Sequence, residues 1–218
     1  RRSPNGRFGF AAWPVEELRA AVDEAHFFGL NVVAHVSGGS EAPRVAVEAG
    51  VDSLEHGWGL EEGTMEAMAE QGTFLVPTLA VVHHKVLLEG DERSPWIEEF
   101  DALFGTMEER LVECRRAHEL GVPSAAGTDA GNPGVLHGKG AQELELLVQA
   151  GLSPMEAILA ATGSAAELCG LGDQTGTVVP GKVADLLLID GDPLADITLL
   201  QDRARIRAVL KAGELVAG

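Results

Sequence analysis

The segment GVPSAAGTDAG, Gly121 to Gly131, decides the fold. A short apolar run from Val122 to Ala126 leads into small residues and then a single carboxylate, Asp129. A carboxylate just beyond the carboxyl end of a buried strand lies where α/β folds place their reacting groups. Asp also commonly caps the helix that follows a strand. The segment alone leaves both interpretations open.

The order of strand and then helix occurs four times along the chain, which predicts a parallel sheet with right-handed crossovers. Short apolar runs predict strands at 30–34, 51–55, 73–79 and 122–126. Apolar stripes with helical spacing, bounded by Pro or Ser starts and Gly stops, predict helices. The expected helices cover 14–28, 40–49, 60–71, 95–120, 141–150, 154–161 and 165–169.

After Gly172 the alternation of strands and helices stops. The run TGTVVPGKVADLLLID has a Pro-Gly turn between two β-like stretches, and 205–216 holds a third stretch, split by Ala212-Gly213. The sequence therefore predicts two parts. Residues 1–172 form a partial (β/α) barrel, and residues 173–218 form a small β segment.

Composition excludes several classes of protein. A net charge of −18 argues against nucleic-acid binding, because phosphate contacts need a basic face. No apolar run approaches the roughly 20 residues that cross a bilayer, and no signal peptide is recognisable. Cys114 and Cys169 lie far apart. We expect both to be buried apolar side chains rather than a disulfide, in a cytoplasmic protein.

Three of the four expected strands end in residues that can bind a metal: His35 in VVAHVSG, His56 in DSLEHG and Asp129 in AAGTDAG. In a parallel α/β barrel, all strand ends open onto one face, so these side chains would converge. Two imidazoles and a carboxylate suit Zn²⁺ or another transition metal. A single His at a strand end is usually structural, but three such strand ends make coincidence a poor explanation.

Other polar residues near the strand ends are weaker candidates. His137, in GVLHGKG, could line the substrate pocket or be an exposed loop imidazole. His83 and His84 follow the third expected strand, and we favour a solvated helix start over ligation. Strand alternation points Glu55 to the face opposite His56, which favours a structural partner over a ligand.

Several segments together resemble the amidohydrolase superfamily, especially the branch with imidazolonepropionase-like enzymes and the metal-dependent Xaa-Pro and Xaa-Arg dipeptidases. They are VEELRAAVDEAHFFGLNVVAHVSG, GVDSLEHG, GTFLVPTLA, GTDAG, MEAILAATGSAAELCGL and GTVVPGKVADLLLIDGDP. The resemblance implies a TIM-type (β/α)8 barrel flanked by a β-sandwich, to which 173–218 would contribute strands. It covers nearly the whole chain.

The resemblance also implies metal-dependent hydrolysis of a C–N bond in a dipeptide or other small molecule. His35 matches the strand-5 ligand of the family and His56 the strand-6 ligand. Asp129 matches the strand-8 aspartate, which binds metal and takes a proton from the nucleophilic water. The implied cofactor is one or two divalent ions, zinc first among them. The substrate itself is not readable, because the βα loops set specificity.

Only strands 5–8 of the family's eight are recognisable. The His-x-His pair of strand 1 and the lysine of strand 4 have no match in these residues. The sequence therefore predicts a C-terminal half-barrel with exposed sheet edges. A truncated gene, a separate chain carrying the other half, or a self-paired homo-oligomer would account for it, and we favour truncation. We expect weak or absent activity alone; the alternative function is a catalytically incompetent half that binds or assembles.

Overall fold

The first part of the chain is built on a small parallel sheet. The computed structural model describes residues 11, 13–37, 39–88, 105–131 and 135–218. Strands β1 (Val33–Val36), β2 (Ser53–His56) and β3 (Phe74–Val76) pair in the order β1-β2-β3, all parallel. The predicted parallel sheet is confirmed, with strands shorter than expected.

The expected fourth strand, 122–126, is reduced to one bridge between Leu75 and Ser124. The Leu75 N–H donates to Pro123 O at 2.8 Å, and the Ala125 N–H donates to Leu75 O at 3.0 Å. This segment therefore extends the sheet beyond β3 in the expected direction. Its ladder is short because only β3, itself three residues long, is available as a partner.

Eight helices are assigned among the described residues. They are α1 (Val15–Phe27), α2 (Glu41–Ala49), α3 (Glu62–Gln71), α4 (Leu79–Leu88), α6 (Met107–Glu119), α7 (Ala141–Ala150), α8 (Pro154–Ala160) and α9 (Gly163–Leu168). Seven correspond to predicted helices. The first part of the expected 95–120 helix, up to 104, lies outside the described residues. Residues 105–106 are not helical, so the expected helix began too early there. Capping boxes at Thr106 and Ser153 begin α6 and α8.

Helix α4 begins at Leu79, the last position of the expected strand 73–79. Strand β3 stops at Val76 because Pro77 has no N–H to continue the ladder. Thr78 then takes a φ of 49°, which turns the chain out of the sheet, and α4 begins at Leu79. The expected strand 73–79 was therefore too long at its carboxyl end.

Helices α1, α2 and α3 cover only one face of the sheet. Leu54 and Leu75 point into the core beneath these helices and are 0% and 2% exposed. On the other face, Val33 is 59% exposed. The described strands do not close a barrel, and this open face is the one that would line a barrel's interior. The fold is thus half of a parallel α/β barrel, as expected.

A second core joins the helices that follow the sheet to the tail. Leu146 and Leu147 of α7 are almost fully buried and belong to the same cluster as Ala157 of α8. Ile197, in the short 3₁₀ helix η1 (Ile197–Gln201), packs into this cluster. Gln201 Nε2 also donates to Glu145 Oε2 on α7 at 2.7 Å.

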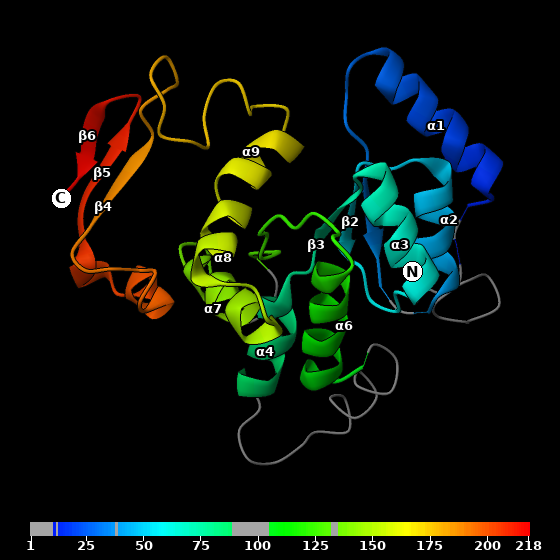
Figure 1. The fold of residues 1–218 in the computed structure, drawn as a ribbon, viewed down its shortest axis with the longest axis horizontal. Helices are drawn as coiled ribbons and strands as arrows, with labels where there is room; N and C mark the ends of the chain where they lie inside the picture. The colour runs from blue at the N-terminus through cyan, green and yellow to red at the C-terminus, as the bar shows by residue number, and fades with distance from the viewer. Residues whose placement is uncertain (1–10, 12, 38, 89–104, 132–134) are drawn as a thin grey trace.

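The tail is a separate antiparallel sheet, at the opposite end of the molecule from α1 (Figure 1). Strands β4 (Leu186–Ile189), β5 (Ile206–Lys211) and β6 (Glu214–Ala217) pair in sequence order, and η2 (Arg203–Arg205) precedes β5. The stretch 205–216 is a hairpin that turns at Ala212-Gly213, both at positive φ. The stretch before Pro180 forms no strand. The predicted boundary between 172 and 173 stays a prediction.

The two cysteines differ in burial. Cys114, on α6, is 3% exposed, and burial raises the pKa of its thiol to about 12. Cys169 is exposed, so the expectation that both are buried was wrong for this residue. It follows α9 at the surface. Both thiols are free. No helix among the described residues is long and apolar enough to cross a membrane.

Candidate active site

His35 and His56 meet at the carboxyl ends of β1 and β2. His35 Nδ1 and His56 Nε2 are 3.0 Å apart, and the two rings stand at 84° with their centroids 4.6 Å apart. His35 is exposed on the open face, whereas His56 is only 7% exposed. The structure thus brings together two of the three residues that the sequence predicted to be ligands.

The backbone of His56 explains how its side chain reaches His35. The strand register pairs His56 with Val36, whose side chain is buried on the helix side of the sheet. Regular alternation would place His56 on that side as well. A φ of 68° at His56 instead turns the chain at the end of β2 and directs the imidazole toward the open face. For a residue with a side chain, this left-handed conformation is strained.

Thr78 fixes the tautomer of His56. Thr78 Oγ1 lies 2.8 Å from the carbonyl oxygen of Pro77, which can only accept, so the hydroxyl proton points there. His56 Nδ1 lies 2.6 Å from the same hydroxyl oxygen and must therefore donate to it. The proton of the neutral ring is then on Nδ1, and Nε2 presents its lone pair toward His35.

Asp129 does not complete a ligand cluster with the two histidines. It is exposed, with a φ of 52°, just beyond the segment that pairs with β3. Among the described residues, no group of three or more His, Cys, Asp or Glu side chains is arranged to hold a metal. Partial burial lowers the pKa of His35, and the negative charge of Asp129 partly offsets that effect. Asp129 is therefore near enough to act electrostatically on the histidine pair.

His137 lies beside the Asp129 loop. Its ring is exposed, and Nε2 would be 3.6 Å from a Cβ added at Gly131. His83 belongs to α4 and is half-buried, so it lies within a helix rather than at a helix start. Whether His137 lines a substrate pocket stays a prediction.

Glu55 shares the open face with His35, its partner in the strand register. Ser53 Oγ donates to Glu55 Oε1 at 2.9 Å. Burial raises the pKa of Glu55; the Ser53 hydrogen bond lowers it, and the charge of Asp129 raises it further. Glu55 thus has a structural partner on its own strand, as the sequence interpretation favoured. The stated reason was wrong, because the positive φ of His56 puts its imidazole on the same open face as Glu55 instead of the opposite one.

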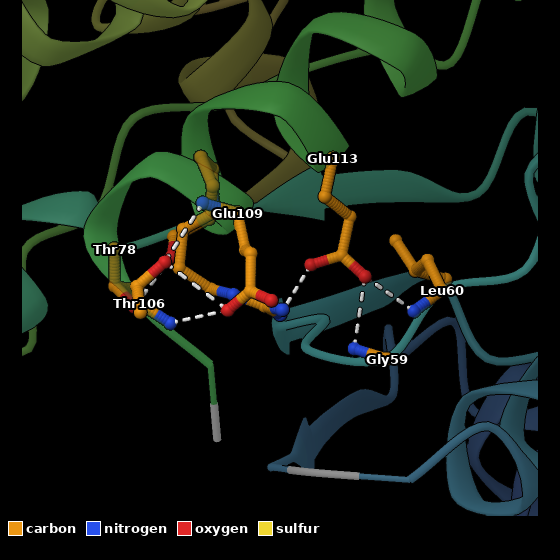
Figure 2. Close-up of polar contacts among 8 residues, drawn as sticks. Gly59, Leu60, Thr78, Thr106, Glu109 and Glu113 are labelled. Atoms are coloured by element: carbon orange, nitrogen blue, oxygen red, sulfur yellow. Dashed lines mark hydrogen bonds and ion pairs between the residues drawn. The ribbon is translucent and has the colours of Figure 1, made fainter. Parts of the chain in front are cut away.

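Two glutamates that the sequence patterns did not single out hold the loops next to His56 and Thr78; Glu113 is partly buried and Glu143 is fully buried. Glu113, on α6, accepts the N–H groups of Gly59 and Leu60 through Oε1 at 2.9 and 2.6 Å, and it pairs with Arg110 (Figure 2). Burial raises the pKa of Glu113, against the opposing charge of Arg110 and these hydrogen bonds. It therefore anchors the loop that follows β2.

Glu143, on α7, is fully buried. Oε1 accepts from the Leu79 N–H at 2.9 Å, and Oε2 accepts from the Ala80 N–H at 2.7 Å. Burial raises the pKa of Glu143 to about 7, although both backbone hydrogen bonds favour the carboxylate. The signal in the sequence was its helical spacing, because positions 143, 146, 147 and 150 share one buried stripe.

Parallel βα units with polar side chains gathered at their strand ends are the arrangement of one half of an α/β barrel. The chain belongs to the amidohydrolase family, because the model of that family matches residues 5–216. The resemblance inferred from the sequence is confirmed. Enzymes of this family are generally metal-dependent.

Individual relatives agree with this assignment. The chain is 34% identical to an ochratoxinase from Aspergillus niger over 213 residues, which is 96% of this chain and 42% of that protein. It is 31% identical to an imidazolonepropionase from Syntrophobacter fumaroxidans, over 81% of this chain and 37% of that protein. A crystal structure of a Xaa-Pro dipeptidase with bound methionine superposes with a TM-score of 0.82 at 35% identity, covering 94% of this chain and 49% of that one. The chain thus spans about half the length of these relatives.

Proposed function

We propose that this chain carries the C-terminal half of the active site of a metal-dependent amidohydrolase that cleaves a C–N bond in a dipeptide or cyclic amide. The observation that carries the proposal is the pair of imidazole nitrogens, His35 Nδ1 and His56 Nε2, facing each other at 3.0 Å. The similarity to a Xaa-Pro dipeptidase and to an imidazolonepropionase supports this class of substrate.

The histidine pair fits a divalent metal ion. Two nitrogen ligands about 2.0–2.1 Å from a tetrahedral zinc are about 3.3 Å apart, close to the separation of these two atoms. With its ring proton on Nδ1, His56 directs the Nε2 lone pair toward His35 Nδ1, and an ion bound between the two rings would replace the hydrogen bond that now joins them. A bound ion would activate water and polarise the scissile carbonyl. We propose His35 and His56 as ligands and Asp129 as a third that joins them in the complete enzyme.

Asp129 has a second proposed role as the proton carrier. A carboxylate at the end of a barrel strand can take a proton from the attacking water and pass it to the leaving nitrogen. Its negative charge already acts on His35 and Glu55, which supports its place beside the reaction centre. His137, next to the same loop, is proposed to contact the substrate.

The rest of the site is proposed to come from a second half-barrel outside these residues. The relatives are about twice as long, and the inner face of β1 is open, with Val33 59% exposed. A covering half would bury that face and bring further ligands to His35 and His56. The 218-residue chain alone is then expected to be weakly active or inactive.

Zinc binding tests the ligand assignment directly. Equilibrium dialysis of the chain with Zn²⁺ is expected to give binding that His35→Asn and His56→Asn each weaken at least tenfold. His118→Asn, which changes a half-buried imidazole on α6 away from the site, is the matched control. Equal affinity in all four proteins would contradict the assignment.

Hydrolysis of a panel of dipeptides and cyclic amides tests the reaction. The chain is assayed alone and after completion by an N-terminal amidohydrolase half, each with and without Asp129→Asn. Turnover only in the completed enzyme, lost in the Asp129 variant, is the expected result. No metal and no turnover in the completed enzyme would reject the proposal.

A second candidate function is that the chain is an assembly half without catalytic chemistry of its own. The observation in its favour is that no three-ligand cluster forms among the described residues. Metal-dependent turnover by the 218-residue chain alone, abolished by Asp129→Asn, would refute this alternative.

A further inference from the structure

We infer that Glu143 is a positioning residue for the candidate site, because its buried carboxylate fixes Thr78, and Thr78 in turn holds the His56 ring with its proton on Nδ1. The inference rests on the proposed function for the role of His56 and adds to it a residue from a different helix. Three linked observations support the inference: the contacts of Glu143, the backbone conformation of Thr78 and the hydrogen bonds of the Thr78 hydroxyl.

The first contact joins α7 to the start of α4. Glu143 is 0% exposed, and each of its carboxylate oxygens accepts one backbone N–H, from Leu79 and from Ala80. These are the first two N–H groups of α4, which have no partner inside the helix. The positive end of the helix dipole also favours a carboxylate there. The start of α4 is therefore tied to a residue more than sixty positions further along the chain.

The second step is the conformation of Thr78. It directly precedes the two residues that Glu143 holds, it is 2% exposed, and its φ is 49°. A β-branched residue in the left-handed region is strained and persists only where its surroundings enforce it. Pro77 on one side and the anchored Leu79 and Ala80 on the other supply that constraint.

The third step is the use of the Thr78 hydroxyl. Thr78 stands at the N-cap position of α4, where a Thr side chain usually accepts an N–H from the first turn of its own helix. Here the hydroxyl donates to Pro77 O and accepts from His56 Nδ1 instead. Glu143 takes over the capping, which leaves the hydroxyl to orient the imidazole. A simple cap would not need a buried carboxylate from another helix, which is costly to desolvate.

The position of the ring proton of His56 is the direct test. Long-range ¹H–¹⁵N spectra of the full chain at pH 8, without metal or substrate, are expected to show His56 protonated on Nδ1. Glu143→Gln, whose amide can accept only one of the two N–H groups, is expected to give a mixture of both tautomers. Glu143→Asp, which withdraws the carboxylate by one methylene group, should give a smaller shift in the same direction.

The Thr78 link is tested by a pair of variants. Thr78→Val removes the hydroxyl at nearly constant size and should lose the tautomer preference, whereas Thr78→Ser should retain it. Leu147→Ala creates a cavity next to the same helix that carries Glu143 and therefore controls for general loss of stability. It should leave the His56 tautomer unchanged. Zn²⁺ affinity is expected to fall on the order of 10- to 100-fold in Glu143→Gln and Thr78→Val.

Several outcomes would overturn the inference. One is a folded Glu143→Gln or Glu143→Asp protein in which His56 keeps the wild-type tautomer. Another is a change of the His56 tautomer in Leu147→Ala as large as that in the Glu143 variants. A third is that both Glu143 variants unfold while Thr78→Val folds normally. The last would make Glu143 a general core residue. A tautomer shift in the chain, together with no Zn²⁺ binding and no turnover in the completed enzyme, would reject the proposed function and leave the link from Glu143 to His56 intact.

Discussion

Glu143 shows how a single buried ionisable residue links stability to pH. Its carboxylate has no exposure to solvent, so ionisation costs more in the folded chain than in water, and the pKa rises to about 7. The folded state therefore holds this proton more tightly than the unfolded state. The contribution of this proton to the free energy of unfolding is fully present below the pKa of the carboxyl group in the unfolded chain. It is lost as pH rises through the higher pKa of the folded chain.

The resulting prediction concerns Glu143→Gln, which cannot titrate. Between about pH 4.5 and pH 7, the unfolding free energy of the wild-type chain should fall relative to the variant by on the order of 3 kcal/mol. Burial and the charge of Glu143 raise the pKa of the Cys114 thiol on α6 to about 12, so this thiol stays neutral throughout the window. Urea unfolding of both proteins at pH 5 and pH 8 measures the difference, and parallel pH profiles would contradict it.

At the scale of elements, the loop between β2 and α3 is held by contacts with two other segments of the chain. Gly59, between β2 and α3, has a φ of 90°, and a Cβ there would lie 2.6 Å from the carbonyl oxygen of Gly39. Its N–H is also bound by Glu113. The loop after His56 is thus confined by the backbone of Gly39 on one side and by the partly buried carboxylate of Glu113 on the other.

Gly59→Ala is therefore expected to lower the free energy of unfolding by about 1–3 kcal/mol, through positive-φ strain and the contact with Gly39. Gly63, inside α3 with open space around it, is the matched control. Gly63→Ala should raise stability by about 0.5–1 kcal/mol, because Ala is the better helix residue. Chemical denaturation of the three proteins measures both effects. A Gly59→Ala chain as stable as the wild type would show that the loop can relax.

At the scale of the whole molecule, apolar side chains are exposed at both of its ends. Leu188 of β4 and Leu215 of β6 are 59% and 68% exposed, and Val33 of β1 is 59% exposed. Strands with uncovered edges and apolar side chains favour pairing with other chains. We therefore expect the isolated chain to self-associate unless another half-barrel covers these surfaces.

Leu215→Lys tests this expectation, since a lysine on an exposed strand opposes edge pairing. Sedimentation velocity at matched concentrations should show a smaller associated fraction for this variant than for the wild type. Glu214→Lys, next to it on the same strand, changes charge without removing an apolar side chain and controls for charge alone. Association that is unchanged by Leu215→Lys would place the contact elsewhere.

The sequence by itself determined the order of elements and the location of the histidines. Helix ends at Gly50 and Gly72 are local features, set by residues a few positions apart, so they were readable. The capping box at Thr106 is also local, but the expected helix 95–120 ran across it. His35 and His56 were found because each ends an apolar run. The end of β3 and the start of α4 were misread, since the turn depends on the backbone of Thr78.

Only the tertiary structure decided how the site is assembled. His56 leaves the regular alternation of its strand through a positive φ, and its tautomer depends on Thr78, 22 residues away. The hydrogen bond from the Leu79 N–H to the Glu143 carboxylate joins residues that are 64 positions apart. Such contacts depend on packing between elements, and strand or helix periodicity carries no information about them. For the same reason the sequence could place Asp129 at a strand end, whereas only the folded chain shows that it does not join the histidines in a ligand cluster among the described residues.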